Sequence, residues 1–563
     1  MRRKKIFCIL IAVMFFGMNI ASAWACSIAG ATGSATVDGR PVIWKNRDSW
    51  GSENCWKTFA YYHKTSNNEF DKFNYVGVTD ADTKVYYSDP KKVKEQEKER
   101  TNEPIDLTPI TEPIHPYKYY PWAGANEKGL GLVQTSAHTL SRDFQQEQGF
   151  TPDQDPNGID NKTLNHMILC SCETVDEVEQ LLRDTNNGWY DGSTARNTNS
   201  IIMVFDKYGN MATFEVSGAD FTRDNVSEEY TPQNFPGYSY PIYPAVHEDD
   251  KDLENPSDGE YNGYDWRTNF ARVDYERDDG FKYFVDEHRT YVEDNQVVNG
   301  EQGQDGIDDR EYSTSTVKRW GRIGIRMDDP HDKDYRYFIQ KEVGAYGIGQ
   351  IYDIETLARS IGDLPYTNEN GEAQKATGWH LSRFCTTFSV VITGSKASDS
   401  DDGKLITMWL AQGEPSHTIF IPIFPFAGEP PEILNDMYLY SNEKRHLLYD
   451  YQDTDGDGDD NECTGYTEER NADHSINLAL LTGNGYYGQG GIQRPIFLTE
   501  NWAYNKYNQK MFNIRYQLDN NFITDDELRQ NLKEWQENIA QTMKTHYING
   551  TYPNEALTDE TSK

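Results

Sequence analysis

The sequence is short of apolar runs and of basic residues. After residues 6–16, no apolar stretch approaches the length of about 18 residues that a membrane-spanning helix needs. The 54 Lys and Arg residues face 91 Asp and Glu residues, which gives a formal net charge of −37. So acidic a surface disfavours nucleic acids and anionic membranes as partners. We therefore expect no transmembrane segment beyond the start of the chain and no nucleic-acid partner.

The motifs of several enzyme classes are absent as well. The chain has no His-Glu-x-x-His, no Walker phosphate loop and no Gly-x-Ser-x-Gly, so zinc, nucleoside triphosphate and serine-hydrolase chemistry have no motif here. Cysteine is scarce, with seven in 563 residues. A chain long enough to build its own core does not need a disulfide framework, and spacing alone leaves the pairing of these cysteines open.

What the chain does have at its start is the three-part form of an export signal. Basic residues 2–5 precede the apolar run 6–16, and Ala23 and Ala25 supply small side chains three and one positions before a cleavage point. Removal of residues 1–25 would leave Cys26 first in a mature chain of formal charge −41, because that segment holds four basic residues and no acidic one. We expect a periplasmic or extracellular protein.

The same four residues, Ala-Trp-Ala-Cys, have a second interpretation. A lipoprotein signal would place lipid on Cys26 and block its amine. Ala23 stands where such signals carry Leu, and the bulky Trp24 follows it. Both residues favour a free N-terminus over the anchor.

An N-terminal cysteine carries its own base. A thiol has a pKa of about 8.5 and an α-amine one of about 7.7–8.0, so the amine can take the thiol proton during attack and return it to the leaving group. Residues 33–45 indicate two strands joined by a turn at residues 38–39. This hairpin would return Lys45 and Asp48 to the side of Cys26.

The stretch resembles the N-terminal-nucleophile cysteine amide hydrolases: choloylglycine hydrolase, penicillin V acylase, penicillin acyltransferase-like proteins and related secreted dipeptidases. Their pattern is a mature N-terminal Cys, a short hairpin and Arg-Asn-x-Asp, which appears here as Lys-Asn-Arg-Asp at residues 45–48. The resemblance implies Cys26 as the nucleophile and Asp48 as the catalytic carboxylate. Lys45 departs from the Arg of the bile-salt type, and this change disfavours bidentate carboxylate binding there.

Two further blocks carry the resemblance and imply oxyanion donors. The run Asn-Glu-Lys-Gly-Leu at residues 126–130 recurs in these hydrolases, and the strand after it brings Ser136 to the place of a donor Asn, where its backbone N–H could serve. Residues 266–272 contain the Thr-Asn pair that implies Asn269 as a side-chain donor, worth about 2.7–4 kcal/mol of barrier. An ordinary core strand and an ordinary turn are the respective alternatives.

A last block, residues 380–424, resembles the closing strands of the acyltransferase and dipeptidase groups. Within it Arg383 could bind a substrate carboxylate or polarise Cys26, and a surface ion pair is the alternative. A carboxylate-binding Arg383 would favour a dipeptidase.

Several elements follow from local patterns. Thr174-Val-Asp-Glu177 is a capping box within a helical stretch at 160–183, and Thr524 begins another helix in the same way. Gly209-Asn210 is typical of a hairpin turn and predicts that the strands on either side of it pair. The predicted strands are 59–63, 73–78, 200–205, 211–216, 405–410 and 418–424.

The C-terminal part holds an acidic loop. Asp453, Asp455 and Asp457 alternate as calcium ligands do, but the twelfth position is Thr464 rather than Glu. A weak structural Ca²⁺ site and a solvated acidic loop both remain open. The proposed chemistry requires no cofactor.

These observations lead to one main interpretation. The resemblance implies an α+β fold, a four-layer αββα sandwich over residues 26–430 with acidic insertions, followed by a smaller, partly helical appendage at 431–563. It also implies hydrolysis of a linear amide bond in a small-molecule amide or peptide, through a thioester on Cys26. An acyltransferase, a dipeptidase and a surface or binding protein whose hydrolase site has lapsed are the alternatives.

Overall fold

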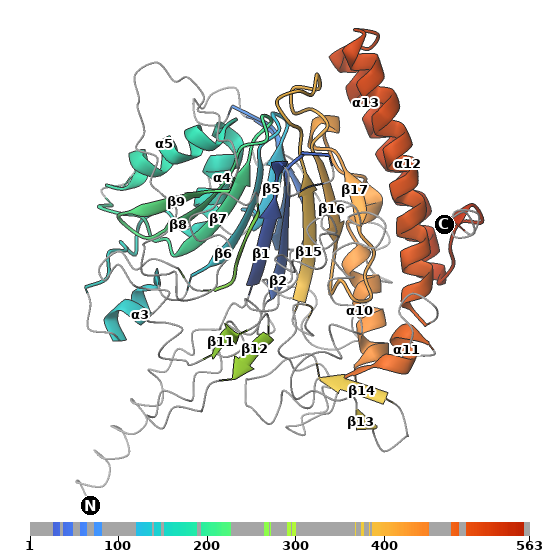
Figure 1. The fold of residues 1–563 in the computed structure, drawn as a ribbon, viewed down its shortest axis with the longest axis horizontal. Coiled ribbons are helices and arrows are strands. Elements are labelled where there is room, and N and C mark those ends of the chain that lie inside the picture. Colours follow the sequence, from blue (N-terminus) through green and yellow to red (C-terminus); the bar gives the residue numbers. More distant parts are fainter. Residues whose placement is uncertain are drawn as a thin grey trace, which may run out of the picture.

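The structure is a computed structural model with a centre of two antiparallel sheets (Figure 1). The residues it describes are 26–33, 36, 38–48, 57–64, 72–80, 120–137, 140–147, 151–188, 193–226, 264–269, 271, 290–293, 296–299, 366–367, 373–376, 382, 386–449, 475–483 and 491–556.

The first sheet, sheet A, has the strand order β10-β1-β2-β15-β16-β17. Strands far apart in sequence are therefore neighbours, and β2 lies between β1 and β15. The bounds of these strands are β1 Cys26–Ala31, β2 Val42–Asp48, β10 Tyr264–Arg267, β15 Thr386–Thr393, β16 Thr407–Ala411 and β17 Ile421–Ile423.

The second sheet, sheet B, follows chain order from β3 to β9. Its strands alternate direction, as hairpin connections require. Their bounds are β3 Lys57–Tyr62, β4 Tyr75–Asp80, β5 Ala123–Asn126, β6 Gly131–Ser136, β7 Ser200–Phe205, β8 Met211–Val216 and β9 Phe221–Asn225.

The two sheets stack face to face around the main hydrophobic core. Alternate residues of sheet A, such as Ile28, Ile43 and Val390, share one buried cluster with Val133 and Met203 of sheet B. Because strand side chains alternate with a period of two, the residues between them point to the outer faces. Each sheet thus has an outer face that needs its own cover.

Helices α4 (Asn161–Ser171) and α5 (Val175–Thr185) cover sheet B. Apolar residues of both helices, including Ile168 and Val178, form a second buried cluster with Leu132 and Phe214 of the sheet. Two helices stand where one helical stretch is predicted, because the Thr174 capping box starts α5 three residues after α4 ends.

Helices α12 (Gln493–Asp519) and α13 (Asp525–Asn549) lie along sheet A. Trp409 of β16 meets the ring of Tyr507 of α12 at 5.3 Å between centroids, and Leu528 and Leu532 of α13 share a cluster with Phe424 after β17. Thr524 and Glu527 form the predicted capping box of α13. These C-terminal helices therefore cover the outer face of sheet A. The predicted domain boundary at residue 430 stays a prediction.

Shorter elements complete the described structure. They are α3 Arg142–Glu147, α10 Met437–Leu448, α11 Leu478–Thr482, the 3₁₀ turns η7 Pro425–Ala427 and η8 Glu432–Leu434, and the strands β11 Thr290–Glu293, β12 Gln296–Asn299, β13 Tyr366–Thr367, β14 Ala373–Ala376 and β18 Ser475–Asn477. Within the ranges described, no helix is both long and apolar enough to cross a bilayer.

The expected α+β class with two antiparallel sheets is confirmed. The predicted hairpin coincides with β7 and β8, and Gly209 adopts the positive φ of 86° that its turn needs. The predicted strands 59–63, 73–78, 405–410 and 418–424 correspond to β3, β4, β16 and β17 with shifted ends. Strand ends are set by ladder partners, which a local pattern does not contain.

Candidate active site

Cys26 begins β1 and lies between β2 and β10. The β1–β10 ladder pairs Ile28 with Arg267, so the same register, continued by two residues, sets Asn269 opposite Cys26. The Cys26 backbone nitrogen donates to Asn269 Oδ1 at 2.7 Å, across 243 positions of sequence. In the described structure this nitrogen is a backbone amide; it would be the α-amine if the chain began at Cys26.

The other ladder places two cations on the same face as the thiol. Cys26 pairs with Arg47 and Ile28 with Lys45, so all four side chains point toward sheet B. Arg47 Nη1 lies 3.7 Å from Cys26 Sγ, and its guanidinium stacks 3.6 Å above the ring of Trp122. The aromatic ring fixes the guanidinium beside the sulfur.

Lys45 is fully buried, and its ammonium donates to the backbone oxygen of Gln134 on β6. Burial lowers the pKa of Lys45 to about 8, although the neighbouring Cys26 thiol raises it in part. Lys45 therefore loses its proton far more readily than an exposed lysine.

At the Cys26 thiol, neighbouring cations outweigh the effect of burial on the pKa. Burial by itself raises the pKa of Cys26, but Lys45, Arg47 and a hydrogen bond from the Asp48 backbone overcome this effect, and the net result is a pKa below the usual value of a thiol. The Asp48 carboxylate acts against this and raises it. A lowered thiol pKa is the property that a cysteine nucleophile needs.

Asp48 is also buried, at the end of β2. Its Oδ1 accepts a 2.6 Å hydrogen bond from Thr386 Oγ1, and its backbone oxygen accepts one from Arg47 Nη1 at 3.2 Å. Thr386 is the first residue of β15, where a register shift interrupts the β2–β15 ladder. Asp48 therefore lies in the same buried group of charges as Lys45 and Arg47.

The structure connects Asn269 with Ser136 as well. The Asn269 amide donates through Nδ2 to Thr135 Oγ1 and to the Ser136 backbone oxygen, each at 2.9 Å. The hydroxyl of Ser136 accepts a long 3.5 Å hydrogen bond from Asn161. As placed here, both hydrogens of the Asn269 amide have acceptors, while its oxygen holds the Cys26 nitrogen.

Some predicted residues lie outside the described residues: Arg383 and the acidic-loop residues Asp453, Asp455 and Asp457. Among the side chains that the structure does describe, no group of three or more His, Cys, Asp and Glu is placed to hold a metal ion.

Sequence reasoning missed three residues of this site: Arg47, Trp122 and Thr386. Arg47 lies two residues after Lys45, so strand alternation places both on one face and could have identified it. Trp122 directly precedes β5 and Thr386 begins β15, so both reach the site from distant parts of the chain, and no local pattern indicates them.

Comparisons with known proteins found similar solved structures but no matching family. No family model matches the chain, and no curated protein matches it. Similar solved structures include a mutant of the conjugated bile acid hydrolase from Clostridium perfringens (12% identity, TM-score 0.31, covering 71% of this chain and 92% of that one). Others are penicillin V acylase from Agrobacterium tumefaciens (10%, 0.31, 71% and 86%) and the N-acylethanolamine-hydrolyzing acid amidase orthologue of Caenorhabditis elegans (10%, 0.24, 65% and 92%). These TM-scores are low, so the chemistry of this chain rests on the residues of its own site.

Proposed function

We propose that this protein is an exported amide hydrolase whose nucleophile is Cys26, which becomes the N-terminal residue when residues 1–25 are removed. The proposal rests on the environment of the Cys26 thiol. The buried sulfur lies beside two cations, and the Cys26 backbone nitrogen is hydrogen-bonded to Asn269. Burial without compensating charge makes a thiol inert, so a buried thiol with a lowered pKa supports a catalytic role.

In the proposed reaction, Sγ attacks the amide carbonyl carbon while the α-amine of Cys26 accepts the thiol proton. The carbon–nitrogen bond then breaks, and the leaving nitrogen takes that proton. Water adds to the thioester, releases the carboxylic acid and restores the thiol. Base and nucleophile on one residue keep this proton transfer short.

The neighbouring residues have separate roles in this proposal. Asn269 Oδ1 accepts a hydrogen bond from the amine and so orients its lone pair toward the sulfur. Arg47 and Lys45 stabilise the thiolate, and Asp48 balances their charge inside the site.

Two measurements on the exported protein test the proposal. Intact-mass spectrometry should find a chain that begins at Cys26 with an unmodified amine. The same preparation should release an amine and a carboxylic acid from at least one member of a panel of penicillin V, a glycine-conjugated bile salt, an N-acyl amino acid and simple dipeptides, followed by liquid chromatography and mass spectrometry. The dipeptides separate a peptidase from an acylase.

A different N-terminus, or diacylglycerol on Cys26, would refute the proposal because either removes the base. A correct N-terminus without turnover of any panel member would favour the lapsed hydrolase site. Adding a free amine as acceptor and searching for the new amide distinguishes acyl transfer from hydrolysis.

A further inference from the structure

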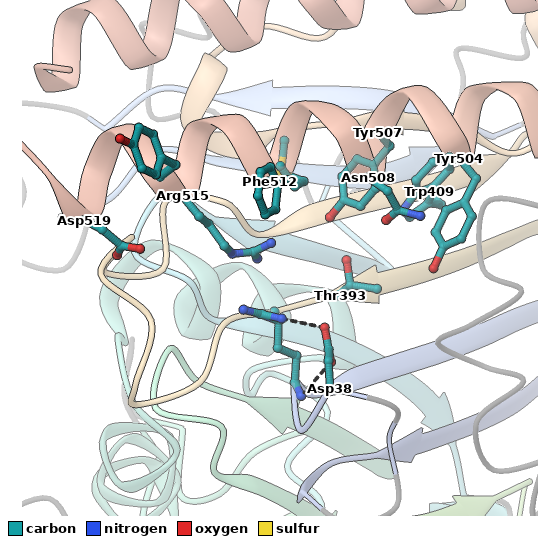
Figure 2. A pocket seen from close by; sticks show the side chains of 13 residues that line it. Asp38, Thr393, Trp409, Tyr504, Tyr507, Asn508, Phe512, Arg515 and Asp519 are labelled. Carbon is teal, nitrogen blue, oxygen red and sulfur yellow. Dashed lines mark hydrogen bonds and ion pairs between the residues drawn. The ribbon is translucent and has the colours of Figure 1, made fainter. Parts of the chain in front are cut away.

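A cavity of about 470 Å³ lies between sheet A and helix α12 (Figure 2). It is at the end of sheet A away from Cys26: Asp38 belongs to the β1–β2 connection, and Thr393 pairs with Val42, at the opposite end of β15 from Thr386. Its volume falls in the range of about 300–1,000 Å³ that is usual for small-molecule sites. The catalytic chemistry proposed above makes no use of it.

Aromatic side chains form much of its wall. Figure 2 shows Tyr504, Tyr507 and Phe512 on α12, with Thr393 on the strand opposite. Tyr504 and Tyr507 lie nearly parallel, 15° apart, and Trp409 meets both rings edge to face. Ligand sites present such flat apolar surfaces to flat ligands.

The aromatic surface continues out of the cavity. Phe512 is 75% exposed and Tyr516 is 59% exposed, one helical turn apart on α12. Phe522 is 67% exposed and packs against Tyr516 at 6.2 Å between ring centroids. Grouped exposed rings of this kind mark a contact surface, so a ligand could extend beyond the cavity.

Both cations that line the cavity, Arg40 and Arg515, face carboxylates, and the lining carboxylate of Asp519 accepts a hydrogen bond from the Ser400 hydroxyl. Arg40 is held in a bidentate hydrogen bond by Asp399, at 2.8 and 2.7 Å, and also by Asp38. Arg515 faces Asp401 at 3.8 Å. Each cation thus has a carboxylate of its own, and the wall favours a neutral ligand over an ion.

Three buried polar atoms of the wall lack a hydrogen-bond partner within the described part of the chain, and one of them is Arg515 Nε, whose 3.8 Å contact with Asp401 is not a hydrogen bond. Trp409 is 1% exposed, yet its Nε1 donor has no hydrogen-bond partner among the residues described, and the same holds for the buried Thr393 Oγ1. An indole N–H can only donate, whereas a threonine hydroxyl donates and accepts. Buried groups of this kind are normally hydrogen-bonded, so the cavity fits a ligand with acceptor oxygens.

We propose that this cavity binds a neutral saccharide. A pyranose ring offers an apolar C–H face to the rings of α12 and a rim of hydroxyl oxygens to Trp409, Thr393 and Asn508. The exposed rings of Phe512 and Tyr516 would bind the next sugar units of a chain. The proposal is independent of the amide-hydrolase activity.

Isothermal titration calorimetry with maltohexaose, cellohexaose, xylohexaose and chitohexaose tests this on the full exported chain. We expect one hexasaccharide to bind, and Phe512→Ala and Tyr516→Ala to weaken that binding about tenfold or more. Both side chains are exposed, so both variants should fold. Trp409→Phe keeps the ring, removes the donor and should weaken binding as well.

Leu447→Ala is the matched control, because Leu447 is 66% exposed on α10 and does not line the cavity. Its affinity should equal that of the unaltered chain. The proposal is wrong if none of the four hexasaccharides binds at millimolar concentration, or if the three cavity variants bind as well as the control. Binding of benzoate without binding of any sugar would also overturn the proposal, since the site would then select an aromatic anion.

Discussion

Two buried thiols of this protein lie in opposite surroundings. Cys172, the C-cap residue of α4, lies among apolar side chains beside the Ser171 hydroxyl, and burial raises its pKa to about 12 although Lys72 lowers it in part. Cys26 is equally buried, but Lys45 and Arg47 lower its pKa. Burial alone therefore makes an inert thiol here, and added cations turn the same burial into an activating one.

Glu500 of α12 extends the comparison to carboxylates. It is fully buried, its Oε1 accepts the Phe420 backbone N–H at 2.7 Å, and burial raises its pKa well above the usual value. Against burial, Glu500 gains only the hydrogen bond from the Phe420 N–H, which lowers the pKa in part. The Cys26 site differs because charge accompanies burial.

The largest expected effect separates the two thiols directly. Cys26→Ala should lower turnover of whichever panel amide is hydrolysed by a factor on the order of 10⁴ or more, as loss of a nucleophile does. Cys172→Ala should leave turnover within about twofold and cost stability only through the small cavity it leaves. Initial rates and thermal unfolding of both variants measure this. Comparable turnover in the two variants would contradict the assignment of Cys26.

Substitutions of Asn269 sharpen the role of its side chain. If its oxygen orients the Cys26 amine, Asn269→Asp keeps the acceptor and should retain more activity than Asn269→Ala, which we expect to lose about 10²–10³-fold in kcat. If Asn269 instead donates to the oxyanion, Asn269→Asp and Asn269→Ala should lose activity alike, because both lack the N–H₂ group. Steady-state kinetics of the two variants decide between these roles.

A smaller effect concerns the Arg47 guanidinium. Arg47→Met should raise the pKa of Cys26, so that at neutral pH its alkylation by iodoacetamide slows about tenfold for each pKa unit gained. Alkylation rates against pH, read by peptide mass spectrometry, give the pKa of Cys26 and Cys172 in one experiment. Arg183→Met is the control, since Arg183 pairs with Glu179 on the helix α5. An unchanged Cys26 profile would show that Arg47 does not stabilise the thiolate.

The smallest effect is on stability. Because the pKa of Glu500 is raised in the folded state, the unfolded chain releases this proton first, and stability falls as the pH rises above the unfolded value of about 4.3. Glu500→Gln keeps the acceptor for Phe420 and removes the titration. As the pH rises from about 5 to about 8, the unaltered chain should lose stability relative to this variant in urea unfolding, by about 1.36 kcal/mol for each pKa unit that burial adds.

The exposed Glu534→Gln serves as the control for that measurement and should follow the unaltered chain. If Glu500→Gln shows the same pH dependence as the control, burial of Glu500 does not contribute to it.

Local patterns predicted much of the fold. The capping boxes at Thr174 and Thr524 and the β7–β8 hairpin are confirmed, because each depends on residues within a few positions of one another. Residues 160–183 form two helices although the apolar pattern is continuous, because the Thr174 cap begins a second helix. Strand ends at β4 and β16 depend on partners elsewhere in the sheets.

The candidate site likewise contains contacts that a local pattern predicts and contacts between distant residues that it does not. The β1–β2 ladder brings Lys45 and Asp48 back to Cys26 as expected, but the predicted strand from residue 33 and turn at 38–39 were wrong, because β1 ends at Ala31 and a longer connection follows it. The Arg47–Trp122 stack joins two sheets, and the contact of Thr386 with Asp48 spans 338 residues. Neither contact has a local signal.

The sequence by itself indicated that Lys45 and Asp48 return to Cys26, because a hairpin is a local pattern, whereas the register of that hairpin depended on the folded sheet. Only the tertiary structure decided which groups act on the thiol. The β1–β10 ladder set Asn269 against the Cys26 nitrogen, and the stacking of the two sheets removed the cations from water. Electrostatic effects grow when solvent is excluded, and only the folded chain excludes it.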